Sequence, residues 1–140
     1  MSGTESGTGP VGIVLVSHSR QVAESVARLA LGLVGHVTAL PVEAAGGTED
    51  GALGTSSELI TEAVRRADRG AGVVVLADLG SAVLTVRTLL AEEGELPEGT
   101  RLVDAPFVEG AVAAVVTAST GADLDAVAAT ATEAYGYRKL

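Results

Sequence analysis

Apolar residues are distributed along the chain in two alternating patterns. Short continuous apolar runs are separated by longer segments in which apolar positions recur every three or four residues. The short runs predict strands with both faces covered, and the periodic segments predict helices with one buried face. Their alternation is typical of an α/β fold. We expect an open, mainly parallel sheet of four to five strands with helices on both faces.

The first apolar run leads directly into a cluster of polar residues. It covers residues 12–16 and is followed by Ser-His-Ser and then by a helical pattern. Further strands are predicted at residues 37–42, 72–77 and 102–103. Pro41 places the second strand at or near a sheet edge, because proline lacks the N–H that a central strand donates.

Five helices are expected, at residues 22–33, 59–67, 83–90, 108–118 and 124–135. The residues that the first helix is expected to bury are Val22, Val26, Leu29, Ala30 and Leu33. Thr55 to Glu58 has the form of a capping box for the second helix, and Asp123 is expected to cap the last one.

The chain has the size and composition of one globular domain. It contains 140 residues, of which 47 % are hydrophobic, and carries a net charge of −9. We expect a single domain over residues 11–140, preceded by a flexible Gly/Ser/Thr-rich leader over residues 1–10. The acidic charge disfavours nucleic-acid binding, and the lack of cysteine excludes disulfides and thiolate chemistry. Because no apolar run is long enough for a membrane span, we expect a cytoplasmic protein without membrane contact.

His18 lies where ligands collect in an open α/β sheet, at the carboxyl end of the first strand. Imidazole has a reference pKa of about 6.5, so a neutral histidine of the correct tautomer is a usable nucleophile at physiological pH. The start of the next helix would offer N–H groups to an anion. We therefore expect His18 to carry a phosphoryl group. The alternative is a capping or simply an exposed histidine.

Asp78 ends the third predicted strand, as His18 ends the first. In a doubly wound sheet these two strands can be neighbours, so the two side chains can meet. A carboxylate on one ring nitrogen would fix the tautomer of His18 and leave the other nitrogen free to attack. The alternative role of Asp78 is to cap the helix that follows.

Two glycine-containing turns follow the second and third strands and would open at the same sheet edge as His18. The residues expected to bind phosphoryl oxygens there are Ser19, Gly46, Gly47, Thr48, Gly80 and Ser81. For the glycines, ordinary turn formation is the alternative. No Gly-Lys-Ser/Thr sequence is present, which argues against nucleotide hydrolysis by this chain alone.

The remaining polar candidates are given structural roles. His36 begins a predicted strand without a convincing partner, and Asp104 is more suited to a turn than to the site. Asp78 and Asp104 alone do not make a metal site, so no metal is expected. Arg20 either offsets phosphoryl charge beside His18 or is a solvated residue at a helix start.

Four motifs, in this order, resemble a known family. They are Val16-Ser-His-Ser, Ala44-Ala-Gly-Gly-Thr-Glu-Asp-Gly with Gly54-Thr-Ser, Ala77-Asp-Leu-Gly-Ser-Ala and Leu102-Val-Asp-Ala-Pro-Phe-Val-Glu-Gly-Ala. Together they are similar to the IIA domains of the mannose family of the sugar phosphotransferase system. Within that family they most resemble the phosphoryl-donor subunits of phosphoenolpyruvate-dependent dihydroxyacetone kinases. The resemblance extends over about residues 11–134.

This resemblance implies a mannose-type IIA fold and a phosphohistidine relay. The carrier protein HPr would phosphorylate His18, with Asp78 as the carboxylate partner. The group would then pass to ADP held on a nucleotide-binding subunit, and the ATP formed would phosphorylate dihydroxyacetone on a third subunit. This chain is itself expected to bind no cofactor. Members of the family are homodimers, often with an exchanged C-terminal strand, for which residues 98–103 are the candidate.

Two other functions stay open. The chain could pass its phosphoryl group to a sugar-transporting IIB protein, although the Ala-Gly-Gly-Thr and Val-Asp-Ala-Pro segments favour the kinase donor. It could also be a non-catalytic regulatory module of the same fold, and the presence of both His18 and Asp78 argues against this.

Overall fold

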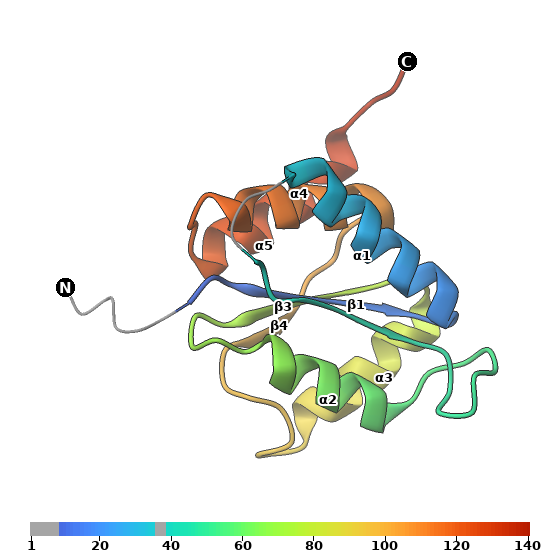
Figure 1. The fold of residues 1–140 in the computed structure, drawn as a ribbon. Coiled ribbons are helices and arrows are strands. Elements are labelled where there is room, and N and C mark those ends of the chain that lie inside the picture. The colour runs from blue at the N-terminus through green and yellow to red at the C-terminus, as the bar shows by residue number, and fades with distance from the viewer. Residues whose placement is uncertain (1–8, 36–38) are drawn as a thin grey trace.

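The fold is a three-layer arrangement in which helices cover both faces of one sheet (Figure 1). It is described by a computed structural model that covers residues 9–35 and 39–140. Most of the predicted leader and His36 lie outside the described residues. In the described part of the predicted leader, the N–H of Gly9 donates to the carbonyl of Arg69 (3.0 Å).

The sheet in the described part of the chain has four strands, all parallel. They are β1 (Gly12–Ser17), β2 (Val42–Gly46), β3 (Val73–Ala77) and β4 (Thr100–Leu102). Their order across the sheet is β2-β1-β3-β4, so β1 and β3 are central neighbours. The α/β class, the parallel sheet and the edge position of the second strand are confirmed.

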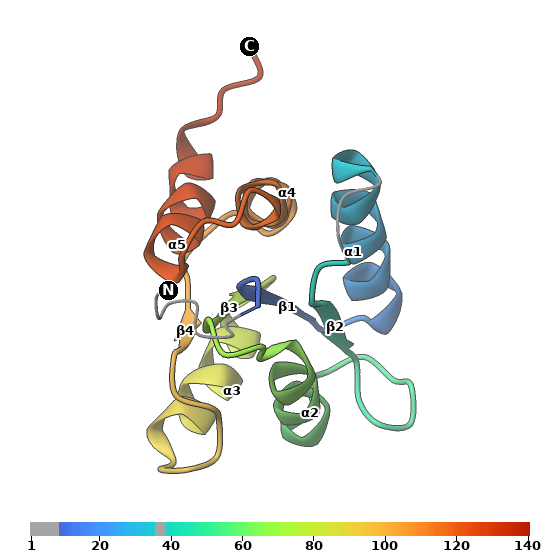
Figure 2. The same cartoon turned by 60° about the vertical axis from the view of Figure 1, so that its left-hand side comes forward.

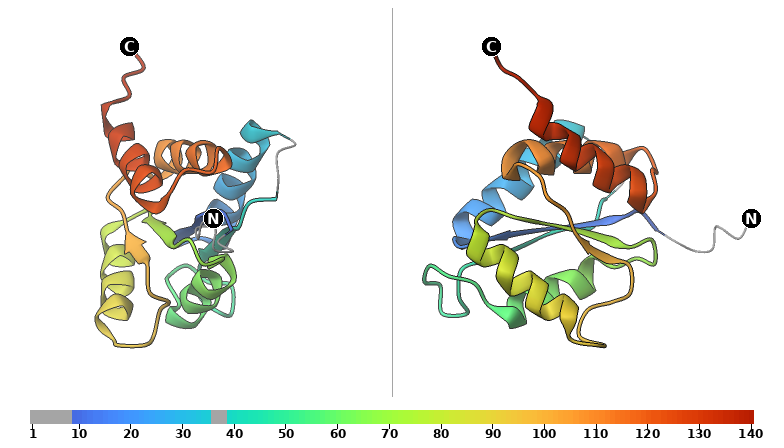
Figure 3. Two further views of the ribbon diagram at one scale, coloured as in Figure 1. Left: turned by 90° about the vertical axis from the view of Figure 1, so that its left-hand side faces the viewer. Right: turned by 180° about the vertical axis from the view of Figure 1, so that it is seen from behind.

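Five α-helices and a short 3-10 helix complete the part of the fold that the structure describes. The α-helices are α1 (Arg20–Val34), α2 (Ser57–Ala67), α3 (Gly80–Ala91), α4 (Phe107–Ser119) and α5 (Leu124–Glu133), and the 3-10 helix is Ala134–Gly136. Helices α1, α4 and α5 cover one face of the sheet, whereas α2 and α3 cover the other (Figure 2). In the right-hand view of Figure 3, β4 and the segment after it lie on the side facing the viewer, at the edge of the sheet.

Strand β1 is buried on both faces because alternate side chains enter two different cores. Ile13 and Leu15 pack with residues of α1, α4 and α5. Val14 and Val16 pack with residues of α2 and α3. Each fully buried aliphatic side chain contributes about 1.5–3 kcal/mol. The apolar run of β1 therefore anchors the centre of the molecule and fixes the position of its carboxyl end.

The second strand was predicted at residues 37–42, of which 37 and 38 lie outside the described residues, and the structure places β2 at Val42–Gly46. Its register sets Ile13 opposite Val42 and Ser17 opposite Gly46. The predicted end of the strand was wrong because β2 continues through the small residues Ala44, Ala45 and Gly46, which suggest a loop. Small residues are needed because α1 runs close above them: a Cβ on Gly46 would lie 2.4 Å from the carbonyl oxygen of Ser19.

The buried face of α1 also differs from the prediction. Val26 and Ala30 are buried as expected, but the other buried positions are Ala23 and Ala27. The three larger residues of the predicted face remain exposed, with fractions of 43 % for Val22, 47 % for Leu29 and 61 % for Leu33. Alanine allows the helix to approach its neighbours closely, and the bulkier side chains lie at the margins of that contact.

Two smaller predictions need correction and one is confirmed. Ser56, not Thr55, caps α2, because its hydroxyl accepts from the N–H of Leu59 (3.1 Å). Residues 100–102 pair in parallel with β3 and are therefore part of this chain's own sheet rather than an exchanged strand. Asp123 caps α5 as expected, accepting from the N–H of Ala126 (3.0 Å).

Candidate functional site

The carboxyl ends of β1 and β3 bring the two main candidate residues together. In the register of these strands Val16 lies opposite Ala77, so Asp78 follows the paired segment directly and His18 lies two residues beyond it. The N–H of Asp78 donates to the carbonyl of Val16 (3.0 Å), which extends the strand pairing by one step. The predicted juxtaposition of the two side chains is confirmed.

Asp78 accepts three hydrogen bonds from the end of β1. One oxygen accepts from the hydroxyl of Ser17 (2.9 Å) and from the backbone N–H of His18 (3.1 Å). The other lies 3.0 Å from Nδ1 of the His18 ring. Burial opposes ionisation of this carboxyl, but the hydrogen bonds from His18 and Ser17 outweigh it and hold the pKa of Asp78 below its ordinary value.

The His18 ring is held between Asp78 and Ser81. A carboxylate can only accept, so Nδ1 carries the proton; in the neutral ring Nε2 then keeps its lone pair. Nε2 lies 2.5 Å from the hydroxyl oxygen of Ser81, which can donate to it in that form of the ring. The side chain is 24 % exposed. The arrangement therefore presents an oriented, partly accessible nucleophilic nitrogen at the surface.

The N-terminus of α3 faces the same ring nitrogen. Ser81 is the second residue of this helix, and no side chain of the described residues caps its first turn. The first N–H groups of a helix lack partners within the helix and carry partial positive charge. Gly80 and Ser81 thus lie where an anion attached to Nε2 would meet backbone donors.

The other predicted phosphoryl-binding residues make contacts of a different kind. Ser19 caps α1 by accepting from the N–H of Val22 (3.2 Å). The α-carbon of Gly46 packs against the backbone of Ser19 and Arg20. The hydroxyl of Thr48 bonds within its own loop, donating to Asp50 and accepting from the N–H of Ala52 (3.0 Å). A phosphoryl-binding role for these three stays a prediction.

The loop between β2 and α2 is tied directly to the histidine. Gly47 adopts a positive φ of 71°, and its N–H donates to the carbonyl of Ser17 (3.1 Å). At the far end of the loop, the N–H of Gly54 donates to the carbonyl of His18 (2.9 Å). The hydroxyl of Thr55 then bonds to that of Thr85 on α3 (3.1 Å).

These contacts add residues that the sequence prediction missed. Ser17 was visible as part of Ser-His-Ser, but its burial and its bond to Asp78 depend on the strand pairing. The contacts of Gly54 and Thr55 join segments that lie far apart in the chain, and no local pattern announces them.

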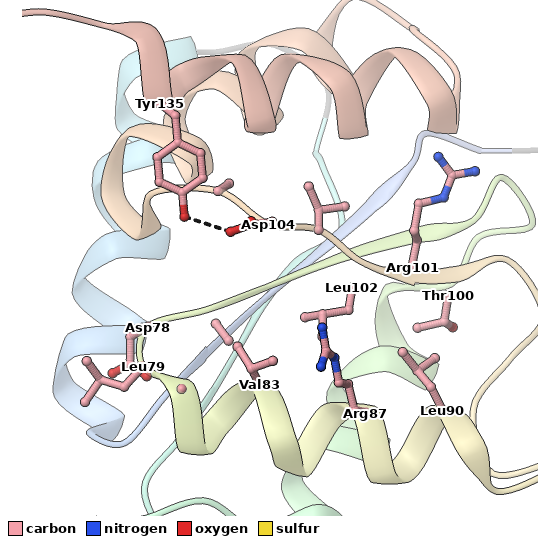
Figure 4. A pocket seen from close by; sticks show the side chains of 14 residues that line it. Asp78, Leu79, Val83, Arg87, Leu90, Thr100, Arg101, Leu102, Asp104 and Tyr135 are labelled. Atoms are coloured by element: carbon pink, nitrogen blue, oxygen red, sulfur yellow. Dashed lines mark hydrogen bonds between the residues drawn. The ribbon is translucent and has the colours of Figure 1, made fainter.

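A hollow of about 670 Å³ opens on the other side of Asp78, between α3 and β4 (Figure 4). Its polar lining includes Asp78, Arg87 and Asp104, and the hydroxyl of Tyr135 donates to Asp104 (2.8 Å). That hydrogen bond raises the pKa of Tyr135 above its ordinary value. The residues lining this hollow do not include His18, so Nε2 is not directed into it.

The described residues contain neither a cluster of metal ligands nor a membrane-spanning helix. Within residues 9–35 and 39–140, no three His, Cys, Asp or Glu side chains are grouped in a way that would hold a metal ion. None of the helices in the same ranges combines the length and apolar character needed to cross a membrane.

Comparison with known proteins gives consistent matches over most of the chain. Residues 12–128 match the family described as "PTS system fructose IIA component" (EIIA-man). The phosphoryl donor subunit DhaM of dihydroxyacetone kinase 2 from Listeria innocua is 36 % identical over 107 residues, covering 76 % of this chain and 84 % of that protein. The corresponding Escherichia coli DhaM is 37 % identical over 122 residues, covering 84 % of this chain and 25 % of its own length. The crystal structure of a protein of unknown function, EF1359, superimposes with a TM-score of 0.78 at 32 % identity, covering 94 % of this chain and 99 % of that one.

Proposed function

The chain belongs to the EIIA-man family, and on this premise we propose that it is a phosphohistidine carrier. It accepts a phosphoryl group on Nε2 of His18 and donates it as the phosphoryl donor subunit of a dihydroxyacetone kinase. The observation that carries the proposal is the line Asp78–His18–Ser81, in which the nucleophilic nitrogen is oriented and accessible. The relatives named as DhaM, the phosphoryl donor subunits of dihydroxyacetone kinases, support the proposal that this chain serves a kinase of that type.

The chemistry is an in-line transfer between two nitrogen atoms. The lone pair of Nε2 attacks the phosphorus of a donor phosphohistidine, the new N–P bond forms, and the electron pair of the old N–P bond returns to the donor imidazole. The Asp78 carboxylate stabilises the positive charge that develops on the ring. The Ser81 hydroxyl, released from Nε2, and the first N–H groups of α3 offer donors to the phosphoryl oxygens.

We propose that HPr is the donor and that ADP on a nucleotide-binding kinase subunit is the acceptor. The ATP so formed serves a dihydroxyacetone-binding subunit, and this chain needs no cofactor of its own. The proposed relay requires an exposed histidine rather than an enclosed substrate cleft, in keeping with the position of His18 outside the hollow beside Asp78.

We also propose that two copies of the chain associate as a homodimer. Among the described strands β4 lies at one end of the sheet and has a neighbour on one side only. The free edge of a parallel sheet offers backbone N–H and C=O groups to another chain, so a contact of this kind would satisfy them.

A second candidate acceptor is a sugar-transporting IIB protein, because the description of the matched family names a fructose component. The chemistry at His18 is the same in both cases. The two functions differ only in which protein removes the phosphoryl group.

The test is a chase of labelled phosphate. Phosphoenolpyruvate, enzyme I and HPr should place one acid-labile phosphoryl group on the wild-type chain and none on His18→Ala, whose circular dichroism should match the wild type. The label should then move to ADP on the kinase subunit and not to a IIB protein. No label on the wild type would favour a non-catalytic regulatory module, and transfer to the IIB protein alone would replace the proposed acceptor.

A further inference from the structure

A closed series of hydrogen bonds links His18, the end of the loop between β2 and α2, and the first turn of α3. The N–H of Gly54 donates to the carbonyl of His18 (2.9 Å). The next residue, Thr55, places its hydroxyl oxygen 3.1 Å from that of Thr85 on α3. The Thr85 hydroxyl lies 3.1 Å from the carbonyl oxygen of Ser81, whose own hydroxyl faces Nε2 of His18. We call these contacts the hydrogen-bond circuit, because they begin and end at the same histidine.

The proton directions in the circuit follow from its acceptors. The Ser81 carbonyl can only accept, so Thr85 gives its single hydroxyl proton to that carbonyl. The Thr85 oxygen then accepts from the hydroxyl of Thr55. With a neutral His18 ring, the Ser81 hydroxyl can donate to Nε2. Each of the three hydroxyl groups therefore has an acceptor for its one proton.

Thr55 is free for this contact because another residue caps α2. The hydroxyl of Ser56 accepts from the N–H of Leu59 (3.1 Å), and Ser56 is itself buried. Thr55 is only half-buried, so neither the cap nor the core accounts for its hydroxyl. That hydroxyl instead reaches α3 at Thr85, one helical turn after Ser81.

The start of α3 has few other contacts that could hold it in place. Its N-cap residue, Leu79, makes no side-chain cap hydrogen bond with the described residues. Nothing in the described structure would lie within 4 Å of a Cβ on Gly80, and Ser81 is exposed. The first buried side chain of the helix is that of Ala82. Because helix ends without caps tend to fray, the contact from the loop restrains the turn that carries the Ser81 hydroxyl.

Thr88, three positions further along α3, makes the same local bond as Thr85. Its hydroxyl donates to the carbonyl of Leu84 (3.0 Å), as that of Thr85 donates to Ser81. Thr88 is exposed, and no hydrogen bond in the described part of the chain joins its hydroxyl to the loop. The two threonines therefore share their bond to the helix and differ in the contact with Thr55.

We propose that Thr55 and Thr85 are positioning residues for phosphoryl transfer at His18. Together they hold the first turn of α3, so that the Ser81 hydroxyl stays beside Nε2 and is in place for the oxygens of an attached phosphoryl group. Neither threonine touches the reacting atoms. Their effect is large because a displacement of about 1 Å in a reacting arrangement can cost about 100-fold in rate. This inference rests on the proposed carrier function, to which it adds two residues.

The first test measures phosphorylation from phosphoramidate, a small donor that requires no docking of a second protein. Thr85→Val should lower the limiting rate at saturating phosphoramidate about tenfold, with little change in the half-saturating concentration, because a displaced Ser81 affects the transfer step and not the binding of the donor. Thr85→Ser keeps the hydroxyl and should restore the rate. Thr88→Val is the matched control: it loses the same bond to the helix and should keep the wild-type rate.

The circuit can also be opened from the loop, which leaves the sequence of α3 unchanged. Thr55→Val should slow transfer to a similar extent as Thr85→Val. The double variant Thr55→Val/Thr85→Val should be no slower than the slower single variant, because both substitutions interrupt the same contact.

A second measurement observes the Ser81 contact without any phosphoryl transfer. The 15N NMR signal of an unprotonated imidazole nitrogen moves upfield as the hydrogen bond that it accepts becomes stronger. With a neutral ring, Ser81→Ala should therefore move the Nε2 signal of His18 downfield, and both valine variants of the circuit should move it in the same direction. Thr88→Val and Thr85→Ser should leave it at the wild-type position. A purely structural role would lower the urea midpoint of Thr85→Val without moving this signal.

The outcomes distinguish the positioning role from the carrier function. An unmoved Nε2 signal in Thr55→Val and Thr85→Val would overturn the positioning role even if His18 is phosphorylated, and even if transfer is slower, because the effect would not pass through Ser81. An equal loss of rate in Thr88→Val would overturn it as well. Conversely, a displaced signal in both valine variants of a protein whose wild type accepts no phosphoryl group would contradict the carrier function and leave the positioning of Ser81 in place.

Discussion

At the scale of single residues, the site is organised by one carboxylate. Asp78 holds both the ring and the backbone of His18, and a third bond from Ser17 fixes the carboxylate itself. A histidine bound through its ring alone could still move with its loop. Here the ring and the peptide group are fixed to the same acceptor, so the direction of Nε2 is defined by the strand ends.

The substitution Asp78→Asn tests this role. The amide keeps the shape of the side chain but can donate to Nδ1, which favours the tautomer with the proton on Nε2, and it does not stabilise a positive ring. Phosphoryl transfer to His18 should therefore slow by about 100-fold without stopping. Rapid-quench single-turnover measurements give the rate, with Ser25→Ala on the exposed face of α1 as the control. A wild-type rate in the Asn variant would remove Asp78 from the mechanism.

The same pair of proteins should differ in acid stability. Because the folded-state pKa of Asp78 is lowered, its ionised form stabilises the native state above the unfolded-state pKa of about 3.9. That contribution disappears as the pH falls through the lower folded-state value. The wild type should thus exceed Asp78→Asn in urea midpoint at pH 7, and the difference should shrink below about pH 4. A difference that stays constant down to pH 3 would contradict the assigned shift.

At the scale of elements, the site depends on how closely β2 approaches the start of α1. Gly46 is the last residue of β2, and its α-carbon faces the backbone of Ser19 and Arg20 directly after His18. Any side chain there would push the two segments apart. The close approach of β2 thereby helps to fix the position of the backbone directly after His18.

Gly46→Ala should therefore be strongly destabilising. The added Cβ would lie 2.4 Å from the Ser19 carbonyl oxygen, a contact with backbone that cannot be relieved by a rotamer change. We expect a loss of about 1–3 kcal/mol in the free energy of unfolding. Gly32→Ala in α1 is the matched control: nothing lies within 4 Å of its added Cβ, and it should stabilise by about 0.5–1 kcal/mol. Urea denaturation measures both, and a neutral Gly46→Ala would refute the close-contact explanation.

The success of the sequence prediction differs between these elements for a physical reason. The paired ends of β1 and β3 were predictable because strands buried on both faces are continuous apolar runs, and parallel strands bring their carboxyl ends to one edge. The position of β2 and the buried face of α1 were not predictable from apolar patterns. Their contacts are made by alanine and glycine, which are chosen for close packing and not for large apolar side chains. The Thr55–Thr85 bond depends on two segments meeting, which no local pattern encodes.

At the scale of the whole molecule, the topology separates the buried core from the edge that bears His18, and the net charge acts on partners at a distance. The helices of both layers bury the sheet, while the carboxyl ends of β1 and β3 present His18 and Asp78 at one edge. A molecule of net charge −9 attracts a basic partner over distances longer than any direct contact. Long-range attraction and short-range contact would then act at successive stages of an encounter.

Ionic strength should separate these two stages. Raising NaCl from about 50 to 500 mM shortens the screening length from roughly 14 to 4 Å and should increase KM for phosphorylated HPr several-fold. The rate with phosphoramidate should change much less, because no second protein has to be steered. Stopped-flow mixing over a salt series gives the association rate. A salt-independent rate would mean that charge plays no part in recognition.

The two hydrogen bonds from His18 to Asp78, one from the ring and one from the backbone N–H, have a consequence for a phosphoryl group bound at Nε2. In the proposed carrier, a phosphorylated imidazole held in this way would not rotate inward, so the phosphoryl group would keep one outward direction. Transfer would then need no hinge motion and no opening of a lid. Its rate would be set by how often the acceptor protein arrives in the right orientation.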